Sequence, residues 1–151
     1  MLHGDALQGG ACVWLVRRRS DGEVEVLFQK RSEKVHNGGL YDASAGGHID
    51  EGEDALTAAL RETREEIGVA LRAEDLRFVT QYATDMKLIS VYLADRTGRD
   101  DAMTLDPEEV GSVEWVKLRD FDAFIRTRVK PPLREIPSHL PVLRYYIENY
   151  L

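Results

Sequence analysis

Residues 46–69, GGHIDEGEDALTAALRETREEIGV, hold the pattern that decides the fold: a glycine-rich acidic segment that leads into a helical one. Apolar spacing predicts a helix over residues 54–67, with Asp54 as N-cap and Gly68 as C-terminal stop. The side chains predicted to form its buried stripe are Leu56, Leu60, Thr63 and Ile67. We therefore expect this helix to pack on the rest of the chain through that stripe.

The same predicted helix carries three carboxylates within five residues, at Glu62, Glu65 and Glu66. Their i, i+3 and i+4 spacing places them on one face, where each pair of like charges costs a few tenths of a kcal/mol. Arg61 and Arg64 lie among them and could relieve the repulsion. By themselves, the three glutamates also fit a solvated acidic face.

The Gly-Gly pair at residues 46–47 gives the acidic face a second interpretation. Glycine lets the backbone approach closely and expose a carbonyl group. Clusters of carboxylate and carbonyl oxygens are the ligands that Mg²⁺ and Mn²⁺ prefer, usually beside the phosphates of a substrate. The combination predicts a site for a hard divalent cation, which would offset the repulsion among the glutamates.

The spacing of these residues resembles the Nudix box. Gly47 is followed after five residues by Glu53, and after seven more by RETREEIGV at residues 61–69. Thr63 is the one variant, at a position where an aliphatic residue is usual, and its place on the buried stripe makes this a change of packing. The resemblance implies an α+β fold, a Nudix-type α/β/α sandwich with a mixed central sheet and the box as a loop-helix.

The resemblance also implies a reaction and its residues. The implied ligands of Mg²⁺ or Mn²⁺ are the carbonyl of Gly46 and the carboxylates of Glu62, Glu65 and Glu66. Arg61 and Glu53 would form a pair that orients the helix and its catalytic glutamates. The implied activity is hydrolysis of a diphosphate bond in a nucleoside diphosphate linked to another moiety X, with metal-activated water attacking phosphorus.

A general base could lie outside the box, where the family varies. Related enzymes often supply it from the segment before the last central strand, which here is DPEEVGSVEW. Glu109 is the first choice and Glu108 the second, although either could simply belong to a solvated acidic loop. One of the box glutamates is the alternative base.

Apolar and β-branched segments predict a sheet around the helix. Strands are predicted over residues 11–17, 24–31, 76–84, 87–95 and 112–118, with a short strand around residues 43–45. A turn signal at residues 19–23 predicts a hairpin between the first two. Helices are predicted over residues 121–129 and 139–151, joined by a proline-rich link at residues 130–137.

The composition restricts the class of protein. The 151 residues predict a single domain, 1–151. A net charge of −7 gives no general attraction to nucleic acid or to an anionic membrane, so neither is expected as a partner. The single Cys12 excludes an intrachain disulfide, and the first ten residues lack a basic and an apolar signal region, which predicts a cytoplasmic location.

Residues 29–48, QKRSEKVHNGGLYDASAGGH, resemble the branch of the family related to isopentenyl diphosphate isomerase. That class has a similar K-x3-PG-x-W-x2-S-x-CGH run. The isomerase's reactive cysteine would fall at Gly46, however, and Cys12 lies in a predicted early strand, where we expect it to be buried. The box is also complete, which favours a hydrolase. An isomerase and a non-catalytic ligand sensor are the alternatives.

Four residues of this region are candidates for substrate binding: Arg31, Lys34, Tyr41 and His48. Arg31 and Lys34 could contact a diphosphate, or could be exposed strand-end cations like Lys30. Tyr41 could stack on a base or fill the core, and His48 could match a metal-binding histidine of the isomerases or only line the loop. The expected partner is a small-molecule, nucleotide-derived diphosphate. A homodimer through the tyrosine-rich carboxyl end is left open.

Overall fold

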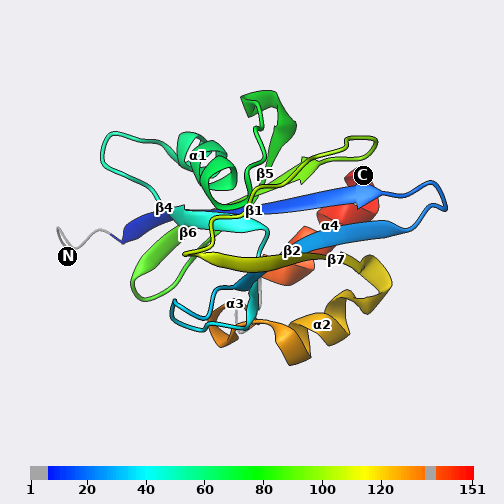
Figure 1. Cartoon of the computed structure of the whole chain (residues 1–151). Helices are drawn as coiled ribbons and strands as arrows, with labels where there is room; N and C mark the ends of the chain where they lie inside the picture. Colours follow the sequence, from blue (N-terminus) through cyan, green and yellow to red (C-terminus); the bar gives the residue numbers. More distant parts are fainter. Residues whose placement is uncertain (1–6, 135–138) are drawn as a thin grey trace.

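The computed structural model describes residues 7–134 and 139–151, and within them a mixed seven-stranded sheet carries helices on both faces (Figure 1). The strands are β1 (Gln8–Arg18), β2 (Val24–Arg31), β3 (Tyr41–Asp42), β4 (Ala45–His48), β5 (Leu76–Ala83), β6 (Lys87–Asp95) and β7 (Val110–Lys117). The helices are α1 (Ala55–Ile67), α2 (Phe121–Arg128), α3 (Pro131–Arg134) and α4 (His139–Tyr150). This arrangement confirms the predicted α+β sandwich with a mixed sheet.

The sheet is splayed between β1 and β2. Residues 16–18 of β1 pair with β2, whereas residues 10–13 pair with β4, and β6 runs parallel to β1 along its other edge. On the far side of the gap β3 pairs with the end of β2, and β7 covers the opposite edge of β2. The segment 41–48 therefore fills the space that opens between β1 and β2.

Ser44 joins the two sides of this gap. Its buried hydroxyl accepts a hydrogen bond from the Leu15 N–H (2.8 Å) and donates one to the Leu27 carbonyl (2.6 Å). Leu15 belongs to β1 and Leu27 to β2. The Ser44 side chain therefore bridges the two strands where the backbone hydrogen bonds between them are interrupted. The backbone groups in the splayed region are thereby satisfied despite being buried.

The two faces of the sheet have different cores. The face covered by α2 and α4 is packed with aromatic rings, with Phe28 at 5.2 Å from Trp14 and 4.5 Å from Phe124 between ring centroids. The α1 face is built largely from small side chains. Its alanines are Ala11, Ala45, Ala58, Ala59 and Ala94. Small residues at this interface allow α1 to lie close to the sheet.

Helix α1 begins and ends as predicted. The Asp54 carboxylate accepts a hydrogen bond from the Thr57 N–H (2.8 Å), and Gly68 closes the helix in the left-handed region at φ 74°. A side chain at Gly68 would also meet the backbone of Thr104 at 2.7 Å, so glycine is required there for two reasons.

The predicted buried stripe of α1 is partly wrong. Thr63 and Ile67 are fully buried, but Leu56 and Leu60 are only half-buried, and Ala58 and Ala59 face the sheet instead. The helix is turned so that the row Ala58, Glu62, Glu66 lies toward the sheet. Within this row Glu62 lies beside Gly47 of β4, and Glu66 accepts a hydrogen bond from the Gly46 N–H. Apolar periodicity could not reveal this orientation, since two of the three residues in that row are charged.

Other predicted elements agree with the structure to within a few residues, and β1 and β2 form the predicted hairpin. The short strand predicted around residues 43–45 corresponds to two short strands: β3 ends before it and β4 begins at Ala45, while residues 43–44 cross the gap without pairing. Part of the predicted link at residues 130–137 is helical, as α3, and residues 135–138 lie outside the described residues. In the described chain, no helix is long and apolar enough to cross a membrane.

Candidate active site

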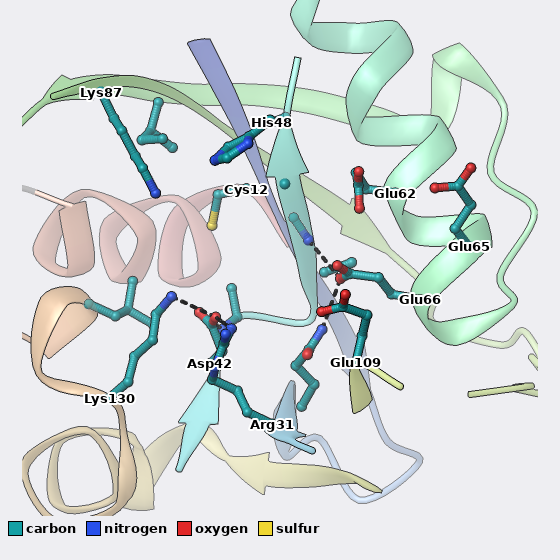
Figure 2. A pocket seen from close by; sticks show the side chains of 18 of the residues that line it. Cys12, Arg31, Asp42, His48, Glu62, Glu65, Glu66, Lys87, Glu109 and Lys130 are labelled. Carbon is teal, nitrogen blue, oxygen red and sulfur yellow. Dashed lines mark hydrogen bonds and ion pairs between the residues drawn. The ribbon is translucent and has the colours of Figure 1, made fainter. Parts of the chain in front are cut away.

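A cavity of about 610 Å³ lies beside β4, between α1, the start of β6 and the segment after α2 (Figure 2). The paired residues of β1 and β4 border this cavity, and helix α1 forms one of its walls. The residues proposed from the sequence that line it are Arg31, Gly46, His48, Glu62, Glu65, Glu66 and Glu109. The fold thus brings most of the sequence candidates into one space.

Arg61 is the centre of an ion-pair network behind this wall. Its guanidinium donates twice to the Glu53 carboxylate (2.8 and 2.9 Å) and once each to Glu62 (2.7 Å) and Glu65 (3.0 Å). A further N–H donates to the carbonyl of His48 (3.0 Å). The hydrogen bonds from Arg61 lower the pKa of Glu53 to about 2. Arg61 therefore ties the end of β4 to α1 and fixes the direction of two of the box glutamates.

Glu66 has a different environment. One carboxylate oxygen accepts hydrogen bonds from the Gln29 amide (3.0 Å) and from the Gly46 N–H (3.1 Å), both neutral donors. Burial, and then the nearby charge of Glu62, raise the pKa of Glu66 to about 8. Within the described part of the chain no lysine or arginine pairs with it. A carboxylate that is half-buried and has no cation beside it is costly to ionise, so this position favours a positively charged ligand.

The two glycines of β4 make room for these carboxylates. A Cβ atom at Gly47 would lie 2.6 Å from the carboxyl carbon of Glu62, so a side chain there would displace that carboxylate. A Cβ atom at Gly46 would lie 2.6 Å from the carbonyl oxygen of Ala11, which is backbone of the paired strand. The Gly-Gly pair is thus required by the approach of α1 on one side and of β1 on the other.

The donor atoms available at this wall are all oxygens, which suits a hard divalent cation. Among the residues that the structure describes, no three acidic, histidine or cysteine side chains are gathered around one point as a ready-made metal centre. The reason is visible in the network, because Glu62 and Glu65 are turned toward Arg61. The donor chemistry fits Mg²⁺ or Mn²⁺, and Arg61 contacts one oxygen each of Glu62 and Glu65, which leaves the second oxygen of each carboxylate for an ion.

The candidates for the general base are separated by the structure. Glu109 lines the cavity and lies on the side of Glu66 (Figure 2). Glu108 does not line it, and its carboxylate contacts the exposed Lys34 ammonium at 3.1 Å. Of the two, only Glu109 can act from its present position on a molecule in the cavity.

Two of the four substrate-binding candidates lie elsewhere. Lys34 is outside the cavity, and the Tyr41 ring is 6% exposed and packs against Phe124 at 4.9 Å between centroids. The Tyr41 hydroxyl donates to Glu114 (3.0 Å), so this residue fills the core. Arg31 and His48 do line the cavity.

Several polar cavity residues were not singled out from the sequence. They are Gln29, Asp42, Lys87, Asp106 and Lys130. Gln29 had a detectable signal, because it is a polar residue inside a strand whose other central positions are apolar, and it is 5% exposed. Lys87 and Lys130 had none, since each is an ordinary lysine at an element boundary.

The chain is similar to known proteins along most of its length. The family model of the NUDIX domain matches residues 7–140. An isopentenyl-diphosphate delta-isomerase of Cereibacter sphaeroides is 28% identical over 86% of this chain and 73% of its own length. Nudix hydrolase 3 of Arabidopsis thaliana is 27% identical over 78% of this chain, which spans 16% of that protein. A solved C. elegans Ap4A hydrolase complex is 23% identical, with a TM-score of 0.66, and the match covers 94% of this chain and 96% of that one.

Proposed function

Because the chain belongs to the Nudix family, with relatives in its isopentenyl diphosphate isomerase-like branch, we propose that it is a metal-dependent hydrolase of diphosphate bonds. Its substrate would be a nucleoside diphosphate linked to another moiety X. The observation that carries the proposal is Glu66, a half-buried carboxylate with only neutral hydrogen-bond donors, at the wall of a cavity of substrate size. Such a group needs a cation in order to hold its charge.

The cation in this proposal is Mg²⁺ or Mn²⁺, held by the Gly46 carbonyl and the three box glutamates. When bound, such an ion neutralises phosphate oxygens and lowers the pKa of a water molecule. Arg61 and Glu53 act as positioning residues, because their pair connects the end of β4 to the helix that carries the glutamates. The negatively charged substrate could then bind beside the glutamates, because the ion would contact both the carboxylates and the phosphates.

Glu109 is the proposed general base, since it faces the cavity on the side of Glu66. It would accept a proton as the water oxygen forms its bond to phosphorus and the bridging oxygen leaves with the other phosphate. Arg31 and His48 would contact the substrate. We leave Lys34 and Tyr41 out of the proposed site, because one points to solvent and the other fills the core.

A second candidate is the isomerase activity. Its relatives cover most of the chain, and Cys12 lies directly opposite Gly46 in the β1–β4 pair and lines the cavity. The thiol is thus beside the position where the isomerase cysteine would fall. Burial, however, raises the pKa of Cys12 above its usual value, which opposes the reactive thiolate. Interconversion of isopentenyl and dimethylallyl diphosphates by the protein would favour this candidate.

The proposal treats residues 1–151 as one catalytic domain that acts on a small molecule. Its test is a chromatographic screen for the products of diphosphate hydrolysis over nucleotide sugars, ADP-ribose, dinucleotides, nucleoside triphosphates and isopentenyl diphosphate, with Mg²⁺, Mn²⁺ or EDTA. Glu65→Gln and Glu66→Gln should each lower turnover by about a hundredfold to a thousandfold. Glu74→Gln, at an exposed position far from the cavity, is the matched control. Turnover that persists in both box variants would exclude the proposal, and binding without turnover would favour a ligand sensor.

A further inference from the structure

The charged side chains of the cavity are separated by sign. Glu62, Glu65 and Glu66 lie on the α1 wall, whereas Lys87 and Lys130 lie on the opposite side of the cavity (Figure 2). The protein as a whole has a net charge of −7, so the positive charge at this end of the cavity is opposite in sign to the net charge of the chain. This separation indicates that the bound molecule has two regions with different requirements.

The topology explains how the two ends come to be apart. Cys12 pairs with Gly46 of β4 on one edge of β1 and with Val91 of β6 on the other edge, so these three residues form one row across the sheet. Lys87 lies four residues before Val91 on β6, which places its backbone about 13 Å from that row along the strand. Glu66 contacts the row itself through the Gly46 N–H. The lysine end is therefore a separate part of the cavity.

The lysine end has a surplus of positive charge. One oxygen of the Asp42 carboxylate contacts both Lys130 (2.8 Å) and Arg31 (3.1 Å), so two cations share a single anion. Lys87 adds a third cation, and no carboxylate in the described part of the chain pairs with it. Three cations and one carboxylate leave two positive charges without a protein partner. Lys130 is also held by its backbone, whose N–H donates to the Tyr41 carbonyl (2.9 Å).

The wall between the two ends is mostly apolar. It is formed by Cys12, Ala43, Tyr82, Ile89 and Leu133, all of which belong to the aromatic core of the α2–α4 face or pack against it. A molecule that extends from the glutamates to the lysines passes over this surface. Its middle therefore needs few polar groups on that side, while its two ends need negative charge.

We propose that moiety X carries a second anionic group, a phosphate or a carboxylate, which Lys87 and Lys130 bind at the end of the cavity opposite the glutamates. The inference rests on the proposed function, because it assigns the scissile diphosphate to the glutamate end. Arg31 contributes through Asp42, which holds Lys130 in place. Lys87 and Lys130 are then specificity-determining residues, since they select among diphosphates without touching the bond that breaks.

The test uses pairs of diphosphates that differ in one anionic group. UDP-glucuronate and UDP-glucose differ by a carboxylate, and NADPH and NADH differ by a phosphate, so the two pairs separate the two chemistries. Binding is measured by calorimetry and hydrolysis by chromatography of the two products of diphosphate cleavage, both with Mg²⁺. We expect the charged member of one pair to be favoured about tenfold, mainly in KM.

Lys87→Met and Lys130→Met should each reduce this preference toward unity, mainly by raising the KM of the charged member. Lys117→Met, at the end of β7 and outside the cavity, is the matched control and should retain the preference. Lys87 is exposed, so its variant tests the idea even if the loss of the Lys130–Asp42 pair disturbs folding.

Each outcome separates this inference from the proposed function. Equal use of both members, with no effect of the lysine variants, would overturn the second anion site and leave the hydrolase intact. Lysine-dependent binding of the charged member without hydrolysis would support the site and count against the hydrolase. If no member of either pair is bound, the second anion site is rejected whether or not other diphosphates are hydrolysed.

Discussion

On the α2–α4 face of the sheet, large aromatic rings fill the space between the layers, whereas on the α1 face alanines bring a helix close and carboxylates occupy its edge. The first face buries much apolar area and should provide most of the free energy of folding. The second includes Glu66, a buried charge that lowers stability in the absence of a cation. The comparison indicates that most of the folding free energy and the proposed metal site belong to opposite faces of one sheet. Substitutions should therefore change the free energy of unfolding and the turnover separately.

The largest effect on stability is expected from Phe28→Ala. Phe28 is fully buried and contacts three other aromatic rings, so the variant should lose about 3–5 kcal/mol of the free energy of unfolding. Urea unfolding measures this change. Metal-dependent turnover per folded molecule should stay near that of the parent protein. A loss below about 1 kcal/mol would contradict the assignment of stability to this face.

Arg61→Met tests the other face. It removes the donor that orients Glu53, Glu62 and Glu65, so turnover or metal affinity should fall by about 10- to 100-fold. The free energy of unfolding should change much less than in Phe28→Ala. Arg64→Met, an exposed position on the same helix, provides the control. If Arg61→Met unfolded the protein instead, the proposed division between the two faces would be wrong.

The pH dependence of stability sharpens the same comparison. The pKa of Glu66 is raised to about 8 in the folded chain, whereas an unfolded glutamate titrates near 4.5. Between these values the folded state binds more protons than the unfolded state, so stability without metal should decline as pH rises from about 4.5 to about 8.

Urea unfolding in EDTA at several pH values should reveal a decline on the order of a few kcal/mol, and Glu66→Gln should remove it. Mg²⁺ should offset the decline in the parent protein, because the ion replaces the proton. The prediction would be wrong if the free energy of unfolding in EDTA rose with pH over this range and Glu66→Gln removed that rise.

The smallest effect is expected from Thr63→Val. Thr63 is fully buried on the α1 face, and its hydroxyl donates to the Ala59 carbonyl (2.7 Å) within the same helix. Valine keeps the shape and removes a polar atom, so the free energy of unfolding should change by less than about 1 kcal/mol and turnover should not change. Thermal unfolding and a single-substrate assay are sufficient. A tenfold loss of turnover would give Thr63 a role in the chemistry that its position does not suggest.

The parts of the molecule that the sequence predicted are those encoded by neighbouring residues. The bounds of α1 follow from Asp54 and Gly68, and the strands β2 and β6 follow from runs of apolar residues. The orientation of α1 was not predictable in the same way, because Glu62 and Glu66 occupy its sheet-facing row.

The lysine end of the cavity depends on contacts between distant residues. Lys87 and Lys130 are 43 positions apart, and they line one cavity because segment 41–48 separates β1 from β2 and opens a space beside β4. No local pattern encodes that space. The cavity residue whose sequence signal could have been recognised was Gln29, a polar residue within an apolar strand. Its buried amide donates hydrogen bonds to Ser44 and Glu66.

The hydrogen bond to the Ser44 hydroxyl also links a backbone amide of the core, that of Leu15, to the residues beside the cavity. The Leu15 amide is protected by this side chain and not by a neighbouring strand, so its deuterium exchange measures how often the splayed strands come apart. The Gln29 amide holds the Ser44 carbonyl and the Glu66 carboxylate at the same time. We therefore expect separation of the central strands to be coupled to release of Glu66, so an ion bound to Glu66 should slow the exchange of an amide deep inside the sheet.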